Sequence, residues 1–242
     1  VPYINMTLSL LNELDIETSF EGSLLKVHPK KNAGTKTIVV ESDWSSASYF
    51  YSIIALSAIG SQIKLLSYKK ESLQGDACLV EIYKQLGVET TFEQNAIIIR
   101  KKHAVISSAV EKSQHISLNL KNAPDIAQTI AVTCFGLGIA CDLSGLHTLK
   151  IKETDRLEAL ENELKKLGAV VSVTTESLYL KAGTKINKNC AIATYKDHRM
   201  AMAFAPLALK VPIVILEADV VTKSYLNFWS DLQQIGFQIA AK

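Results

Sequence analysis

Residues 164–181 read LKKLGAVVSVTTESLYLK, and this stretch decides the fold because its form recurs along the chain. It combines the end of an amphipathic helix, a glycine, a short strand, a polar turn and a second strand. Stretches of the same form begin at Leu10 (LLNELDIETSFEGSLLKV), Tyr83 (YKQLGVETTFEQNAIIIR) and Leu232 (LQQIGFQIAAK). Directly after its helix, each carries a residue placed for the left-handed backbone that commonly ends helices: Asp15, Gly87, Gly168 and Gly236.

Each repeat also has a front half, in which a strand leads into a helix and then into another strand. The predicted elements are strand 37–40, helix 43–59 and strand 62–66; strand 115–120, helix 124–137 and strand 140–143; and strand 191–194, helix 198–209 and strand 212–216. The repeating unit is therefore βαβαββ, with a period of roughly 70–80 residues. This alternation predicts an α/β (α+β) fold with crossover connections. Residues 1–36 supply only a back half, so we expect the chain to be truncated at its N-terminus.

The composition is that of an ordinary globular protein, with 242 residues, 48% of them hydrophobic and 21% charged. A net charge of +2 and interspersed lysines and carboxylates predict no nucleic-acid partner and no membrane association. The cysteines form no CxxC pair and no cluster with histidine, so no metal site is expected. We expect four buried free thiols in a reducing compartment, the cytoplasm: Cys78, Cys134, Cys141 and Cys190.

Four segments carry more polar chemistry than packing requires. They are KETDR at 152–156, TYKDHR at 194–199, NAPD at 122–125 and TKSY at 222–225. The first three begin predicted helices, and the fourth precedes the last helix. Helix capping explains part of this chemistry, because Asp155 and Glu158 have the spacing of a capping box and Asp197 is a candidate N-cap.

Each remaining polar residue also has a structural explanation when taken alone. Asp125 would complement a helix dipole, His198 would be a hydrogen-bonded supporting group, and Lys223 would be solvated. Equivalent helix starts in successive units, however, lie at one end of the assembly, so their positive dipole ends converge. The cations predicted to gather there are Lys152, Arg156, Arg199 and Lys223, with the carboxylates Asp125 and Glu153. Such a site suits a substrate with phosphate and carboxylate groups whose reaction needs proton transfer.

These motifs resemble those of the 5-enolpyruvylshikimate-3-phosphate (EPSP) synthase family. The resemblance is carried by KETDRLEAL at 152–160 together with YKDHRMAMAFAPLAL at 195–209, a highly specific pair in this order. Shorter matches are PYI at 2–4, ESDWSSASYF at 41–50, PD at 124–125 and TKSYLNF at 222–228. The resemblance therefore runs the whole length of the chain.

The resemblance implies an inverse α/β-barrel-like domain of the enolpyruvyl transferase type, built from repeated βαβαββ units. Residues 1–40 would be the C-terminal remnant of a first domain, and residues 41–242 a second domain of three such units. The chain would be about the C-terminal 55–60% of the enzyme, in keeping with the missing repeats. Half a cleft does not exclude water, so we expect this chain to be inactive alone.

The reaction implied is transfer of the enolpyruvyl group from phosphoenolpyruvate to the 5-hydroxyl of shikimate 3-phosphate, with release of phosphate. By the same resemblance, Asp125 would be the base and Glu153 the proton donor. Phosphoenolpyruvate would be held by Arg156, Arg199 and Lys223, and shikimate 3-phosphate by Tyr3, Asp125, Thr148 and Lys152, with His198 in support. Thr148 and Leu226 replace an asparagine and a proline found in other members. The family implies a cytoplasmic monomer without a cofactor.

Two other functions are compatible with the residues. One is the sister enolpyruvyl transferase that acts on UDP-N-acetylglucosamine, which shares the fold but is not expected to carry both long motifs. The other is a non-catalytic domain that binds anions or a partner protein. Phosphate release with each acceptor substrate would distinguish these three hypotheses.

Overall fold

The computed structural model describes residues 2–30, 34–105 and 115–240. Its α-helices are α1 (Pro2–Glu13), α2 (Trp44–Leu56), α3 (Leu79–Gln85), α4 (Ala127–Leu137), α5 (Arg156–Lys166), α6 (His198–Phe204) and α7 (Phe228–Gln234). Its strands are β1 (Thr18–Glu21), β2 (Leu24–Val27), β3 (Gln62–Leu66), β4 (Val88–Glu93), β5 (Ala96–Lys101), β6 (His115–Asn119), β7 (Ala140–Ser144), β8 (Val171–Val173), β9 (Leu178–Leu180), β10 (Cys190–Ile192) and β11 (Ile213–Ile215). Short 3-10 helices are η1 (Gly75–Cys78), η2 (Pro124–Ile126), η3 (His147–Ile151), η4 (Ala205–Leu209) and η5 (Ala218–Lys223).

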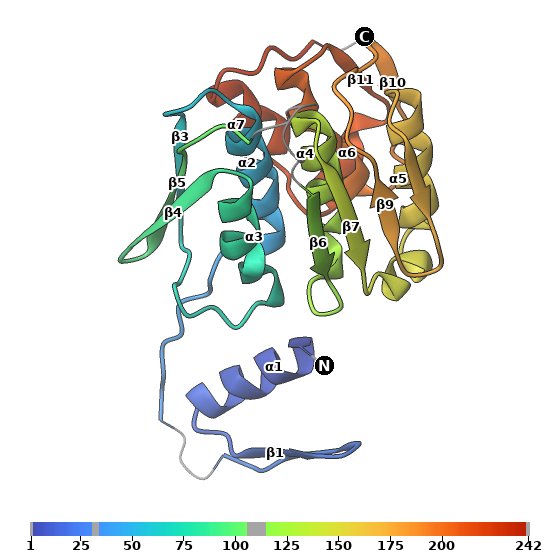
Figure 1. The fold of residues 1–242 in the computed structure, drawn as a ribbon. Coiled ribbons are helices and arrows are strands. Elements are labelled where there is room, and N and C mark those ends of the chain that lie inside the picture. Colours follow the sequence, from blue (N-terminus) through green and yellow to red (C-terminus); the bar gives the residue numbers. More distant parts are fainter. Residues whose placement is uncertain (1, 31–33, 106–114, 241–242) are drawn as a thin grey trace.

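Helices α2, α4 and α6 lie at the centre of the main body and pack against one another (Figure 1). Most of their residues are buried, as expected for helices that are apolar on nearly all sides. Gly136 permits the close approach of α4 to its neighbours. A Cβ atom there would lie 2.8 Å from Leu56 Cδ2 and 2.9 Å from Leu207 Cδ2.

The main sheets lie outside these helices (Figure 1). One sheet has the antiparallel order β3-β5-β4, and another has the order β6-β7-β9-β8 with β6 and β7 parallel. Strands β10 and β11 form a parallel pair. The predicted order of the repeating unit is complete in β6-α4-β7-α5-β8-β9. Helix α1 and the β1–β2 hairpin lie to one side of the main body, below it in Figure 1.

The predicted turn residues all have a left-handed backbone, which confirms the helix ends predicted for the repeat. Their φ angles are 62° at Asp15, 78° at Gly87, 97° at Gly168 and 102° at Gly236. At Gly87 the requirement is also steric, because a Cβ atom would collide with the carbonyl oxygen of His103. The ends of the helices in the repeats could therefore be predicted from single residues of the sequence.

Two strand predictions are wrong. Residues 34–43 contain no strand, although one was predicted at 37–40. Val39 and Val40 are 57% and 84% exposed, and no described strand pairs with them. β-branched residues favour a strand only where a partner completes the ladder. Residues 237–240 after Gly236 also form no strand, and the end of that predicted stretch, residues 241 and 242, lies outside the described residues.

The prediction of four buried thiols is correct for two cysteines. All four are free, and Cys134 and Cys141 are buried. Cys78 is exposed and Cys190 partly exposed, so for them the prediction is wrong. Both lie at the limits of short elements, where an apolar neighbourhood in the sequence does not ensure burial. Of the helices in the described ranges, none combines the length and the apolar character needed to cross a membrane.

Candidate active site

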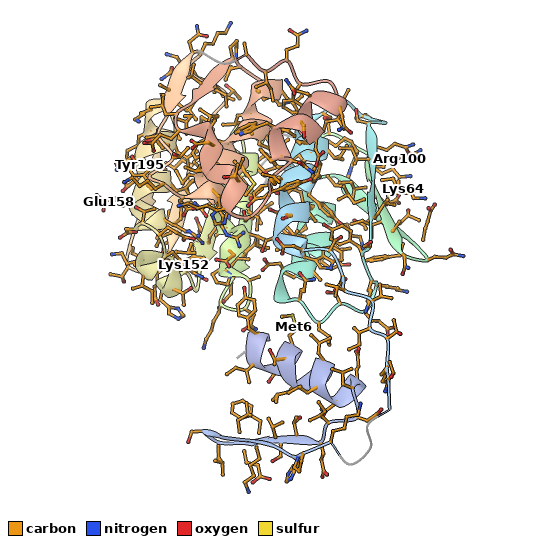
Figure 2. The ribbon with its side chains drawn as sticks, turned by 180° about the vertical axis from the view of Figure 1, so that it is seen from behind. Met6, Lys64, Arg100, Lys152, Glu158 and Tyr195 are labelled. Atoms are coloured by element: carbon orange, nitrogen blue, oxygen red, sulfur yellow. The ribbon has the colours of Figure 1, made fainter. Side chains whose placement is uncertain are left out.

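The helix starts singled out in the sequence converge around one carboxylate, that of Asp125. Its Oδ1 atom accepts a hydrogen bond from Arg156 Nη1 at 3.0 Å and lies 3.4 Å from Lys152 Nζ. Its Oδ2 atom lies 3.3 Å from Arg199 Nη2. Lys152 is at the end of the main body that faces α1 (Figure 2). Three of the four cations predicted to gather at these helix starts, Lys152, Arg156 and Arg199, therefore meet at Asp125.

Arg156 connects three carboxylates while its side chain is only 2% exposed. Its Nε atom donates to Asp197 at 2.6 Å and its Nη2 atom to Glu153 at 2.6 Å, besides the contact with Asp125. A guanidinium group has five N–H donors in one plane. These three hydrogen bonds leave one further N–H on each terminal nitrogen.

Asp197 has a second role that the sequence analysis missed. Its Oδ1 atom caps α6 by accepting from the Arg199 backbone N–H at 2.8 Å, while Oδ2 holds Arg156. The carboxylate is completely buried. The two residues before it, Tyr195 and Lys196, have φ angles of 54° and 57°, so the chain enters α6 through two consecutive left-handed residues. A capping aspartate and an ion-paired aspartate have the same sequence signature, which explains the omission.

Tyr3 brings α1 to the same carboxylate. Its hydroxyl donates to Asp125 Oδ2 at 3.5 Å, across 122 residues of sequence. Burial and the nearby negative charge of Asp125 raise the pKa of Tyr3 to about 12, so this hydroxyl remains a donor at neutral pH.

The electrostatics keep both candidate catalytic carboxylates ionised. Burial alone would raise the pKa of Asp125, but Arg199, Lys152 and Arg156 together lower it below its usual value. Burial acts likewise on Glu153, whose pKa is nevertheless lowered by its own backbone N–H and by Arg156. Burial and then Arg199 lower the pKa of His198, whose Nδ1 atom lies 3.9 Å from Glu153. His198 is therefore largely neutral at neutral pH.

Two predicted site residues lie outside this network. The Lys223 ammonium is exposed and donates to the carbonyl oxygen of Lys196 at 3.0 Å. The Thr148 hydroxyl oxygen is buried and has no hydrogen-bond partner among the described residues. Neither contacts Asp125 within the ranges that the structure describes.

A pocket of about 530 Å³ lies beside the network. Its lining residues are Glu153, Thr154, Ala193, Thr194, Tyr195, Lys196, Leu216 and Glu217. Glu153 therefore lies between the Arg156 guanidinium and open space. Within residues 2–30, 34–105 and 115–240, no group of three or more histidine, cysteine, aspartate or glutamate side chains is placed to hold a metal ion.

Solved structures that share this fold include an EPSP synthase and an enolpyruvyl transferase. EPSP synthase from Acinetobacter baumannii aligns with 96% of this chain and 54% of its own chain, with a TM-score of 0.78 and 21% identity. The enolpyruvyl transferase NikO from Streptomyces tendae aligns with 99% of this chain and 54% of its own, with a TM-score of 0.68 and 13% identity. These likenesses confirm the predicted α/β fold of the enolpyruvyl transferase type.

Sequence comparison defines the family within that class. The model of the family EPSP synthase (3-phosphoshikimate 1-carboxyvinyltransferase) matches residues 1–232. The 3-phosphoshikimate 1-carboxyvinyltransferase of Bacteroides fragilis (strain YCH46) is 38% identical over 241 residues, covering 98% of this chain and 57% of that protein. The chain belongs to the EPSP synthase family. It spans little more than half the length of the curated relatives it matches.

Proposed function

We propose that the protein, together with the portion of its relatives that this chain does not cover, transfers the enolpyruvyl group of phosphoenolpyruvate to the 5-hydroxyl of shikimate 3-phosphate. The observation that supports this most directly is the gathering of Lys152, Arg156 and Arg199 on Asp125. Family membership and both long motifs agree with it. Residues 1–40 would then end a first domain, and residues 41–242 would form most of a second. The enzyme would be a cytoplasmic monomer without a cofactor.

The proposed binding roles follow from the donors that remain available. The two remaining terminal N–H groups of Arg156, with Arg199, would hold the carboxylate of phosphoenolpyruvate. Lys223 would hold its phosphate, since its ammonium is exposed and bonded only to a backbone carbonyl among the described residues. Shikimate 3-phosphate would contact Lys152, Tyr3 and the unpartnered hydroxyl of Thr148.

The proposed chemistry uses the two carboxylates in different ways. Asp125, held ionised by cations, would accept the proton of the 5-hydroxyl as that oxygen bonds to the C2 carbon of phosphoenolpyruvate. Glu153 would deliver a proton to the methylene carbon. The Glu153 carboxylate would then take back one methyl proton as phosphate leaves, which restores the double bond, and the proton on Asp125 would leave with the phosphate. A substrate carboxylate on Arg156 competes with Glu153 for that cation, which raises the pKa of Glu153 toward that of a proton donor.

The test measures phosphate release by this chain after it has been extended at its N-terminus with the coding sequence that precedes it in frame in its gene. We expect turnover with phosphoenolpyruvate plus shikimate 3-phosphate, and none with UDP-N-acetylglucosamine. Asp125→Asn should lower kcat by about 100-fold or more, the usual scale for loss of a general base. Asp142→Asn is the matched control, because Asp142 lies on β7 and pairs with the half-exposed His115. Turnover only with the sugar nucleotide, or an unchanged kcat in Asp125→Asn, would contradict the proposal. The 242-residue chain alone should give no turnover.

A further inference from the structure

Asp76 is a buried carboxylate close to Arg199, and the mechanism proposed above gives it no role. It lies on η1, and the residue is only 5% exposed. Its Oδ2 atom accepts a short hydrogen bond from the Ser45 hydroxyl, at the start of α2. Its Oδ1 atom is buried and has no hydrogen-bond partner among the described residues. Burying a carboxylate with an unsatisfied oxygen is costly, so packing alone does not account for an aspartate here.

Ser45 connects Asp76 to Arg199. The Arg199 Nη2 atom lies 3.4 Å from Ser45 Oγ, so this hydroxyl oxygen accepts from the guanidinium. Ser45 is itself fixed, because its backbone N–H donates to Asp43 at 3.0 Å. Two further contacts of the Arg199 guanidinium, with the backbone oxygen and the carboxylate of Asp125, are also long, at 3.4 and 3.3 Å. The hydroxyl of the buried Tyr49 is another hydrogen-bond partner of Arg199. The orientation of Arg199 therefore depends on several weak contacts, of which Ser45 is one.

The direction in which the Ser45 hydroxyl hydrogen points decides whether the contact between Ser45 and Arg199 is attractive. A hydroxyl has one hydrogen to donate and two lone pairs that accept. When Asp76 is ionised, the hydrogen points to Asp76 and the lone pairs face Arg199. When Asp76 is protonated, it can donate to Ser45, and the Ser45 hydrogen is then free to turn toward the guanidinium.

We propose that Asp76 is a positioning residue for Arg199, which it orients through the Ser45 hydroxyl for binding of the phosphoenolpyruvate carboxylate. This inference rests on the proposed function. It assigns Asp76 no contact with substrate, and it predicts an effect on substrate binding that is larger than the effect on turnover.

The charges around Asp76 place its titration in a measurable range. Burial raises the pKa of Asp76 to about 6, with the Ser45 hydrogen bond and Arg199 opposing and Asp125 and Asp43 assisting. Other titratable groups that face it are Tyr3 on α1 and Cys78 on η1. The contact of Ser45 with Arg199 is thus favourable above about pH 6, where Asp76 is ionised, and it weakens below that pH.

The experiment measures steady-state kinetics of the complete enzyme and of Asp76→Asn, Ser45→Ala and the double variant. Loss of one charge-assisted contact should raise KM for phosphoenolpyruvate about 10-fold, with kcat changed less than about 3-fold. KM for shikimate 3-phosphate should stay unchanged. The double variant should be no worse than Ser45→Ala, because both changes break one relay. The rise of KM for phosphoenolpyruvate below about pH 6 should disappear in Asp76→Asn. Asp142→Asn should behave as the unchanged enzyme.

The outcomes separate the two proposals. An active enzyme whose KM and pH profile are the same in Asp76→Asn and Asp142→Asn would overturn the positioning role alone. Equal losses in kcat and in both KM values, or additive losses in the double variant, would also overturn it, since they indicate a structural effect. If Asp76→Asn does not fold, Ser45→Ala alone must show the KM increase and the lost pH dependence. If the complete enzyme without any substitution gives no turnover, both proposals are overturned.

Discussion

Replacing Asp197 with asparagine would separate the two roles of this buried side chain. One oxygen caps α6 through the Arg199 N–H, and asparagine caps helices as well as aspartate does. The other oxygen holds Arg156 Nε at 2.6 Å, and both groups are almost completely buried. In Asp197→Asn, an uncharged amide would face the Arg156 guanidinium. If the amide NH2 group turned toward Arg156, two hydrogen-bond donors would face each other without an acceptor.

The magnitude follows from burial. Removing one partner of a buried ion pair costs about 3–5 kcal/mol when the other charge stays buried without compensation. Arg156 would keep Asp125 and Glu153 as partners, so we expect the lower end of that range, about 3 kcal/mol. With a urea m-value of roughly 3 kcal/mol/M for a chain of this size, the unfolding midpoint should fall by about 1 M. Folded proteins have only about 5–15 kcal/mol of stability, so the expected loss is a large part of the total.

Asp155→Asn is the matched control, because Asp155 also caps a helix, α5, through the N–H groups of Leu157 and Glu158. Its ion pair with Lys150 is 3.6 Å long and partly exposed, and such pairs contribute about 1 kcal/mol or less. Urea unfolding followed by far-ultraviolet circular dichroism measures both variants. Equal midpoints for Asp197→Asn and Asp155→Asn would refute the argument that the buried pair with Arg156 dominates.

Two further predictions concern stability. The folded-state pKa of Asp76, about 6, exceeds its ordinary value of 3.8, so the folded state binds more protons between these values and stability falls as pH rises. Asp76→Asn should therefore gain roughly 2 kcal/mol relative to the chain without substitution between pH 4 and 7, and a constant difference in unfolding free energy would contradict this. Gly136→Ala should lower stability by about 1–3 kcal/mol, because the added Cβ would press on Leu56 and Leu207. Gly183→Ala, with no atom within 4 Å of its new Cβ, should be nearly neutral, and thermal unfolding measures both glycine variants.

The parts of the fold that were predictable depend on local chemistry. Asp15 and Gly87 end helices by their own backbone preference, and the buried helix α4 is apolar on nearly all sides. The strand predicted at 37–40 was wrong because a strand depends on a neighbour that the sequence does not reveal. Val39 and Val40 favour a strand locally but have no pairing partner among the described residues.

The same distinction applies to the candidate site. The charged residues at the helix starts were visible because they exceeded what capping requires. Five of them form one network, namely Asp125, Lys152, Glu153, Arg156 and Arg199. Ser45 and Asp76 were missed because they are 31 residues apart and neither is unusual in its own segment. Their significance comes from a contact within one unit of the repeat and from the contact of Ser45 with Arg199 in another unit. Residue types and spacing indicate which groups are available, whereas long-range packing decides which of them act together.

The two left-handed residues before α6 have a consequence for protein engineering. Tyr195 and Lys196 hold a backbone conformation that glycine adopts without strain, and each such non-glycine residue costs of order 1 kcal/mol. Glycine at either position would relieve that cost but would widen the range of directions from which the chain can enter the helix. A library screened only for heat tolerance should therefore accumulate glycine at 196. At 195 glycine would also remove the Tyr195 hydroxyl, which donates to the buried Glu163 carboxylate at 2.7 Å, so the gain there is offset. A library screened for turnover should keep side chains there, so sequencing the survivors of the two screens would reveal the trade-off between rigidity and strain at this junction.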